Sequence, residues 1–215
     1  MLLIFNIFEL GIKEGEKNAY VAVGKNNITK SVLNDEGTLG MYLVQEKENP
    51  NMTYMFEVYE DDKSYQEHIK SEQYKEFLRQ SPTILTNHKK KIQVMPEYMG
   101  DKKFVQTRNT RVNYVTVDVK EGFNDAFREI VLDEMKQSIK KEEGVYVIYA
   151  ATAKENPDKW YFFEIYENEK AYQKHRKTAH FKKYIEQTEN IIENKEFINI
   201  EGIKLLNKGN LNYVK

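Results

Sequence analysis

Two segments of the sequence combine carboxylate, phenol and imidazole side chains, which are groups that can move protons. The first runs from Phe56 to Tyr74 and the second from Phe162 to Phe181. Each pattern predicts an aromatic β-strand, an acidic turn and a helix that carries a histidine. Because an imidazole suits proton transfer near neutral pH, both segments are candidates for acid–base chemistry.

A glutamate lies in the middle of each predicted strand, Glu57 in the first segment and Glu164 in the second. Since side chains alternate along a strand, Glu57 shares a face with Tyr59, and Glu164 shares one with Tyr166. A carboxylate on a strand covered on both faces is costly to bury unless it has a partner. The residues leave two roles open: a structural carboxylate held by hydrogen bonds or an ion pair, and a general acid or base.

In each predicted helix a tyrosine and a histidine three residues apart share one face, and a hydroxyl residue follows at the next turn. The two sets are Tyr65, His68 and Ser71, and Tyr172, His175 and Thr178. Such a stripe could hold a polar ligand, and its imidazole could transfer a proton. The alternative is a half-buried histidine bonded to a backbone carbonyl at the edge of the helix.

Other polar residues give weaker signals. His180 lies five residues after His175, about 140° further round an ideal helix, so we expect the two rings not to converge on a metal ion. With no cysteine and no His-Glu-x-x-His motif, no metal site is predicted. Asn6 and Asn113 lie within predicted strands, where asparagine is disfavoured, which indicates either a buried structural bond or a ligand contact.

The two segments belong to a longer internal duplication. With a constant offset of 107 residues and no gap, positions 47–68 and their counterparts share 13 identities in 22 positions. The halves are expected at residues 1–100 and 108–207, with the polar stretch MGDKKFVQTRN as the linker between them.

Each half predicts the order β-α-β-β-α-β, which is the split βαβ arrangement of ferredoxin-like domains. The strands are expected at 3–12, 39–47, 52–60 and 90–98 in the first half, and at 111–119, 145–153, 159–167 and 196–206 in the second. The helices are expected at 16–34 and 62–79, and at 123–141 and 169–187. Both helices of such a unit cover the same face of its sheet, so the other face needs a partner. We therefore expect an α+β chain in which two tandem units form an intramolecular pseudo-dimeric α/β barrel.

The composition excludes several classes of function. Hydrophobic residues make up 40% and charged residues 31%, and the net charge of −1 gives no positive field for nucleic acid or an anionic membrane. The lack of cysteine excludes disulfides and thiol catalysis and fits a reducing compartment. No apolar run approaches about eighteen residues, and the first segment lacks the features of a signal peptide, so a cytoplasmic location is expected.

The second copy carries the motif FFEIYENEKAYQKHRKTAHFKKY at 162–184, which resembles that of the antibiotic biosynthesis monooxygenase superfamily. Within that superfamily it is most similar to the branch of quinol monooxygenases and phospho-autoinducer isomerases. The first copy, at 56–77, is a looser match, with Ser71 in place of threonine and Gln73 in place of the second histidine. The resemblance covers both halves and implies a dimeric α/β barrel, here fused in tandem, with pockets between each sheet and its helices.

The resemblance also implies an activity. Members of this type oxidise activated phenols or quinols with dioxygen and without flavin or metal, so no cofactor is expected. The implied partners are a small aromatic or quinol-like substrate and dioxygen, and a further homodimer is compatible with the fold. By position, the implied catalytic residues are His175, His68, Asn113 and Asn6. The implied substrate-binding residues are Tyr166, His180, Tyr172, Glu164, Tyr59, Tyr65 and Glu57.

Three alternatives remain open from the sequence. The same histidine could serve an isomerase that transfers a proton without consuming oxygen. Heme-degrading relatives need a proximal histidine near the end of the second helix, where this chain has Leu78 and Ile185. The fold could also serve as a non-catalytic binding or stress-response module.

Because Gln73 departs from the motif, the first copy could act mainly as the partner of the second.

Overall fold

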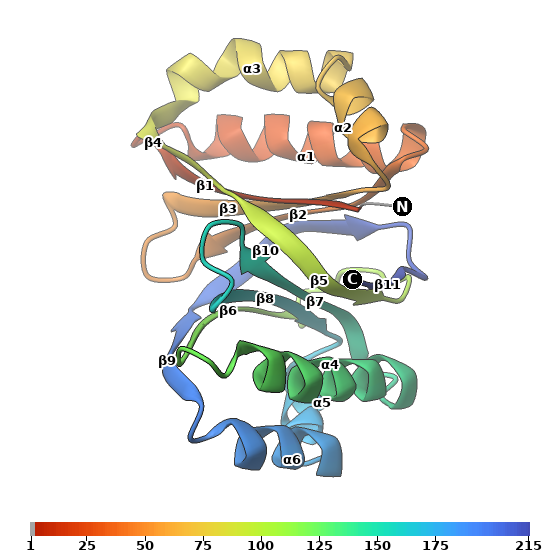
Figure 1. Cartoon of the computed structure of the whole chain (residues 1–215). Helices are drawn as coiled ribbons and strands as arrows, with labels where there is room; N and C mark the ends of the chain where they lie inside the picture. Colours follow the sequence, from red (N-terminus) through yellow and green to blue (C-terminus); the bar gives the residue numbers. More distant parts are fainter. Residues whose placement is uncertain (1–2) are drawn as a thin grey trace. The chain divides into compact units, whose positions relative to one another are not determined.

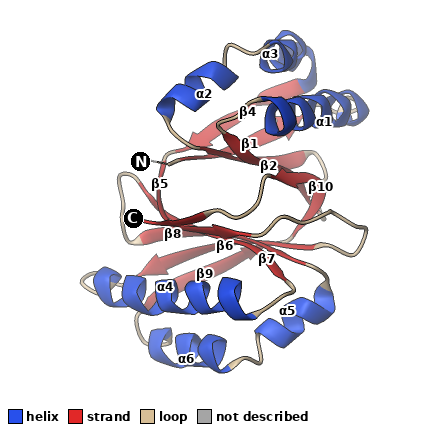
Figure 2. Ribbon diagram, turned by 90° about the vertical axis from the view of Figure 1, so that its right-hand side faces the viewer, coloured by secondary structure: helices blue, strands red, loops and turns tan. Residues whose placement is uncertain are grey.

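The computed structural model describes residues 3–215, and the chain divides into two compact units. Unit 1 contains the chain up to Val94 together with Phe104–Gln106 and Ile200–Gly209. Unit 2 contains Met95–Lys103, Thr107–Asn199 and Asn210–Lys215. The first two residues of the expected first half lie outside the described residues. In each unit, helices cover one face of an antiparallel sheet (Figures 1 and 2). Two α+β, ferredoxin-like units in tandem are therefore confirmed.

Unit 1 follows the predicted order of elements. Its elements are β1 (Ile4–Ile12), α1 (Lys17–Asn34), β2 (Thr38–Glu46), β3 (Met52–Tyr59), α2 (Asp62–His68), α3 (Glu72–Ile84), β4 (Leu85–Ile92) and, from the far end of the sequence, β10 (Ile200–Asn207). The sheet has the order β10-β2-β3-β1-β4. This order places β3, which carries Glu57, between β1 and β2 in the interior of the sheet.

Unit 2 repeats this plan. Its elements are β5 (Val94–Asp101), β6 (Arg111–Val119), α4 (Asn124–Lys141), β7 (Val145–Ala153), β8 (Lys159–Tyr166), α5 (Glu169–His175), α6 (Ala179–Thr188), β9 (Ile192–Ile198) and β11 (Asn212–Val214). The sheet has the order β11-β5-β7-β8-β6-β9. The strand β8, which carries Glu164, again lies in the interior of the sheet.

The single final strand predicted for each half, at 90–98 and at 196–206, is wrong. Two strands occupy each region, and the second of each pair enters the other unit's sheet: β5 pairs with β7, and β10 pairs with β2. The edges of β2 and β7 would otherwise present unpaired backbone groups, and the exchanged strands satisfy them. Periodicity within one segment gives no information on which sheet it will join.

The continuous helices predicted at 62–79 and 169–187 are also wrong. Each is divided into two helices, α2 and α3 in unit 1 and α5 and α6 in unit 2. The hydroxyl of Ser71 accepts a hydrogen bond from the backbone N–H of Tyr74 at 3.3 Å, and Thr178 accepts one from that of Phe181 at 3.3 Å. Serine and threonine are strong N-cap residues, so each hydroxyl begins a new helix.

The core of unit 2 lies between the sheet and its helices. Apolar residues of β6, α4 and β8 alternate or recur with the period of their element and fill this layer, among them Val115, Val117, Phe127, Val131, Trp160 and Phe162. A corresponding apolar cluster fills unit 1. None of the helices in residues 3–215 is long and apolar enough to cross a membrane.

Candidate functional site

The polar centre of unit 2 starts at Glu164, in the middle of β8. In the sheet, Glu164 is paired directly with Asn113 on β6. The Nδ2 group of Asn113 donates a hydrogen bond to Oε2 of Glu164 at 3.0 Å, and the hydroxyl of Tyr166 donates another to the same oxygen at 2.9 Å. Glu164 therefore has the partners that its position on an interior strand requires.

His175 lies at the C-terminal end of α5 with only 2% of its surface exposed. Its ring centroid lies 5.3 Å from that of Tyr166 and 4.7 Å from that of Phe181. Because Thr178 interrupts the helix three residues later, the chain turns and brings α6, with Phe181, back over the imidazole. The predicted ligand-binding role of the Thr178 hydroxyl is not supported, since that hydroxyl caps α6 and donates to the carbonyl of His175 at 2.8 Å.

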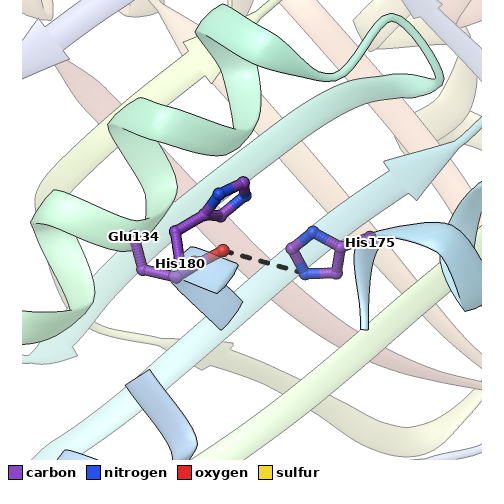
Figure 3. Close-up of side chains that lie close together, drawn as sticks. All are labelled: Glu134, His175 and His180. Carbon is purple, nitrogen blue, oxygen red and sulfur yellow. Dashed lines mark ion pairs between the residues drawn. The ribbon is translucent and has the colours of Figure 1, made fainter. Parts of the chain in front are cut away.

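The sequence reasoning missed the helix that faces this imidazole. Along α4 and just beyond its end, Glu134, Ser138 and Glu142 are spaced by four residues and share one face. Nδ1 of His175 lies 3.0 Å from Oε1 of Glu142. Nε2 of His175 lies 3.8 Å from Oε1 of Glu134, and Figure 3 marks this second contact. The hydroxyl of Ser138 donates to Glu134 at 2.6 Å. A run of polar residues four apart at matching positions in both copies was the signal that could have revealed them.

His180 joins the same cluster, and the prediction that its ring would not converge with that of His175 is wrong. The two ring centroids are 6.4 Å apart, and Nε2 of His180 lies 2.7 Å from the Glu142 oxygen that also contacts His175. The prediction assumed one ideal helix, whereas the break before α6 changes the direction in which His180 projects.

Burial and charge act in opposite directions on this cluster. Burial raises the pKa of Glu134 to about 7, even though His175 and the Ser138 hydroxyl lower it. Burial lowers the pKa of His175, but its hydrogen bond to Glu142 and the nearby carboxylates outweigh burial and raise the pKa above its ordinary value. For Glu142, hydrogen bonds from the imidazoles outweigh burial and lower the pKa. The environment thus favours a charged imidazole next to Glu142.

A cavity of about 40 Å³ adjoins the cluster between the sheet and the helices of unit 2. Most of its lining residues are apolar or aromatic, and its polar lining comes from Glu134, Glu164, Tyr172, His175 and Lys195. The Lys195 ammonium lies 5.6 Å from the centre of the Tyr184 ring. The cavity is much smaller than a typical ligand site, and its lining surface is about as polar as it is apolar.

Among the described residues, the lining of this cavity does not include Asn113, Tyr166 or His180. Asn113 and Tyr166 do not contact the cavity but donate hydrogen bonds to the carboxylate of Glu164. His180 lies instead beside a groove between α4 and α6, of about 740 Å³, which Glu134 and Tyr184 also line. Glu134 and Tyr184 therefore separate the inner cavity from the outer groove.

Unit 1 contains a matching network with different side chains. In the positions of Glu134, Ser138, Glu142 and His180 it has Asn27, Ser31, Asp35 and Gln73. Nδ1 of His68 lies 3.2 Å from the Ser31 hydroxyl oxygen, and Gln73 donates to Asp35 at 3.0 Å. The Nε2 atom of His68 is buried and has no hydrogen-bond partner in the part of the chain that the structure describes.

The carboxylate of unit 1 is held as in unit 2. The hydroxyl of Tyr59 donates to Glu57 at 2.9 Å, and Nδ2 of Asn6 lies 3.5 Å from the same oxygen. Burial raises the pKa of Glu57 to about 7 and lowers the pKa of His68 to about 4. Tyr65 packs against Tyr59 with ring centroids 5.2 Å apart, as Tyr172 packs against Tyr166 at 5.1 Å. The two imidazoles, equivalent in sequence, thus differ in charge preference.

The comparisons with known proteins agree with this architecture. The sequence model of the family described as antibiotic biosynthesis monooxygenase matches residues 3–80 and 110–187. A candidate monooxygenase from Lactobacillus acidophilus is 28% identical with a TM-score of 0.94, over 99% of this chain and 100% of that one. A candidate monooxygenase from Fusobacterium nucleatum is also 28% identical with a TM-score of 0.93, over 100% and 98% of the two chains.

A protein described as anthrone oxidase-like shares 9% identity and a TM-score of 0.56 over 96% of this chain and 97% of its own, which shows likeness of fold alone. Among curated proteins, none matches the sequence significantly.

Proposed function

Because the chain belongs to the antibiotic biosynthesis monooxygenase family, we propose that unit 2 oxidises a small phenol- or quinol-like molecule with dioxygen and without a bound cofactor. The observation that carries this proposal is the buried imidazole of His175, which lines an internal cavity together with Glu134 and Glu164. Full-length similarity to two candidate monooxygenases supports it.

The reaction balances without an added reductant. A hydroquinone and one dioxygen molecule give a hydroxyquinone and one water molecule, so one oxygen atom ends on a ring carbon and the other leaves as water. Dioxygen takes up the four electrons that the substrate gives up. The protein has to remove a proton, hold the resulting anion and keep bulk water away, and each of these tasks is within reach of ordinary side chains.

The side chains of unit 2 divide these tasks. Nε2 of His175 faces Glu134, and this pair receives the substrate proton, while Glu142 holds the opposite side of the imidazole. Lys195 at the cavity offers a positive charge to the phenolate. Asn113 and Tyr166 position Glu164. Aromatic walls exclude water and pack against the substrate ring.

Substrate entry requires movement of side chains. The cavity of about 40 Å³ is far below the roughly 300 Å³ at the lower end of ligand pockets. Phe197 lines the cavity, is 52% exposed, and its ring centre lies 5.5 Å from the Lys195 ammonium. We expect bound substrate to displace Phe197 and to enlarge the cavity toward β9.

The proposal is tested by measuring oxygen uptake with a panel of hydroquinones and anthrones, and by identifying the products. His175→Gln should lower turnover by about 10²- to 10⁴-fold, the usual contribution of a proton-transfer group. His68→Gln is the matched control, because it changes the equivalent imidazole of unit 1, and it should leave turnover within about twofold. Thermal melting of each variant verifies folding.

Two results would overturn the proposal. One is the absence of oxygen uptake with every member of the panel. The other is a folded His175→Gln variant that retains full turnover, which would remove the imidazole from the reaction. If His68→Gln alone abolished turnover, the active cavity would belong to unit 1.

One observation favours a second function, proton transfer alone. The polar side chains at the cavity can all exchange protons, and the cavity has room for about three water molecules. An isomerase on this site would exchange a substrate C–H proton for solvent deuterium without consuming oxygen. Deuterium exchange under argon, measured by NMR with the same panel, separates the two functions, since exchange without oxygen uptake in air supports the isomerase.

A further inference from the structure

We propose that Glu134, His175 and His180 form a binding site for one divalent first-row transition-metal ion in unit 2. One ligand atom from each of the three residues lies within 4.8 Å of the others. The three side chains come from α4, from the end of α5 and from α6, and they lie close together, with the Glu134 carboxylate directed at His175 (Figure 3). All three are almost fully buried: the side chain of His175 is 2% exposed, and those of Glu134 and His180 are 8% exposed.

Glu142 orients both imidazoles for such an ion. Its Oε1 atom lies 3.0 Å from Nδ1 of His175 and 2.7 Å from Nε2 of His180. Each ring then has its other nitrogen available, Nε2 in His175 and Nδ1 in His180. A histidine that binds a metal almost always donates its second N–H to a carboxylate or carbonyl. One carboxylate that anchors two imidazoles in this way is therefore the outer partner that a metal site requires.

The three ligand atoms, which lie within 4.8 Å of one another, must approach by up to about 1.5 Å to reach tetrahedral spacing. Nε2 of His175 and Oε1 of Glu134 are 3.8 Å apart, whereas two ligand atoms of a tetrahedral zinc ion are about 3.3 Å apart. Two imidazole nitrogens and one carboxylate oxygen suit zinc, iron(II), cobalt, nickel or copper, and are a poor set for magnesium or calcium. The adjoining cavity has room for the water molecules that would complete the coordination.

The duplication supplies an internal comparison. The positions of Glu134, His175 and His180 correspond in unit 1 to Asn27, His68 and Gln73. Two of the three ligands are therefore amides in unit 1, and amide side chains are weak ligands for these ions. Within residues 3–215, unit 2 alone combines these three ligands, so we expect one ion per chain.

An ion at this site would occupy Nε2 of His175, the nitrogen to which the proposed function assigns the proton. Metal binding and that reaction would then exclude each other, and a bound ion would inhibit turnover. Binding itself does not depend on the proposed function, because it can be measured on the resting protein without substrate. A protein that binds the ion and has no oxidase activity would refute only the proposed function.

The experiment is a titration of metal-free protein with Zn²⁺ by calorimetry and with Co²⁺ by visible absorption. We expect one ion per chain and a Co²⁺ spectrum with nitrogen and oxygen ligands. His180→Gln, which places the residue of unit 1 in unit 2, should weaken binding at least tenfold. Glu142→Gln, which removes an outer partner, should weaken it by about 10- to 100-fold. His88→Ala is the control, since His88 is exposed and lies outside the cluster.

A second measurement needs no variant. In NMR spectra of the histidine side chains, one equivalent of Zn²⁺ should shift the ring signals of His175 and His180 and leave those of His68 and His88 unchanged. The proposal is overturned if Zn²⁺ fails to bind stoichiometrically, if His180→Gln binds as tightly as the unmodified chain, or if only the His88 signals move, which would indicate surface binding.

Discussion

At the scale of single residues, equivalent side chains in the two copies have different neighbours and different pKa shifts. Glu57 and Glu164 have the same hydrogen-bond partners, a tyrosine two residues later and an asparagine on the neighbouring strand. The equivalent histidines differ in how close a carboxylate lies: Nδ1 of His68 is 3.2 Å from the Ser31 hydroxyl and 3.9 Å from Oδ2 of Asp35, whereas Nδ1 of His175 is 3.0 Å from Oε1 of Glu142. A carboxylate in hydrogen-bond contact stabilises the charged imidazole, and burial without that contact favours the neutral form.

Glu57 gives a prediction about stability and pH. Burial raises its pKa from an ordinary value of 4.5 to about 7 in the folded state. The folded protein therefore holds this proton more tightly than the unfolded chain does. The stabilisation is complete below pH 4.5 and is lost as the pH rises to about 7. Glu57→Gln removes that loss, so at pH 8 we expect the variant to gain about 3 kcal/mol in free energy of unfolding relative to its gain at pH 4.

Urea unfolding at pH 4, 6 and 8 measures this effect. Exposed Glu48 serves as the control, because Glu48→Gln makes the same substitution at the surface. An unchanged pH profile in Glu57→Gln would show that the carboxylate of Glu57 does not titrate differently in the folded state.

At the scale of secondary-structure elements, the break between α5 and α6 builds the cluster. A continuous helix would project His180 away from His175. The N-cap at Thr178 begins a new helix, so His180 projects in a different direction. The same device, with Ser71 as the cap, separates α2 from α3 in unit 1. A capping hydroxyl is thus the local feature that decides which side chains meet Glu142.

Replacing this cap has a predictable effect. Thr178→Ala leaves the N–H of Phe181 without its acceptor, and loss of an N-cap typically costs about 1 kcal/mol of stability. Thr178→Ser keeps the hydroxyl and should keep the stability. Urea unfolding of both variants measures the difference. If Thr178→Ala and Thr178→Ser unfold alike, the cap does not stabilise the break.

At the scale of the whole molecule, the two halves of the sequence exchange strands. The strand β10 completes the sheet of unit 1, although the sequence that encodes it lies in the second half, and β5 enters the sheet of unit 2. Each sheet therefore contains chain from both copies. Separating the halves would leave the edges of β2 and β7 without their partners.

This exchange predicts the behaviour of a divided chain. Residues 1–106 and 107–215, produced together with a tag on one fragment, should copurify, because β5 and β10 each pair with strands of the other fragment. Shortening the second fragment to 107–199 removes both β10 and β11, which pair with β2 and β5 of the first fragment, and should weaken the association. Size-exclusion chromatography measures both. Two fragments that migrate as separate, folded monomers would contradict the prediction.

The sequence by itself predicted most of the elements. The strand at 145–153 and the helices at 16–34 and 123–141 agree with the structure to within about one residue at each end. Local periodicity carries this information, because burying one face of a helix or strand imposes its own period on the sequence. The duplication supported the predicted order of strands and helices, because the same order could be found independently in both copies.

The sequence also predicted candidate groups for chemistry, namely the paired glutamates, asparagines, tyrosines and histidines. Only the tertiary structure decided which of them meet. Glu134 and Glu142 lie more than thirty residues from His175 in the sequence. Their contacts with His175 depend on how α4 packs, and the local sequence around each residue does not predict that packing. The place of His180 and the destination of β5 and β10 were set in the same way, by a capped helix break and by sheet edges that needed partners.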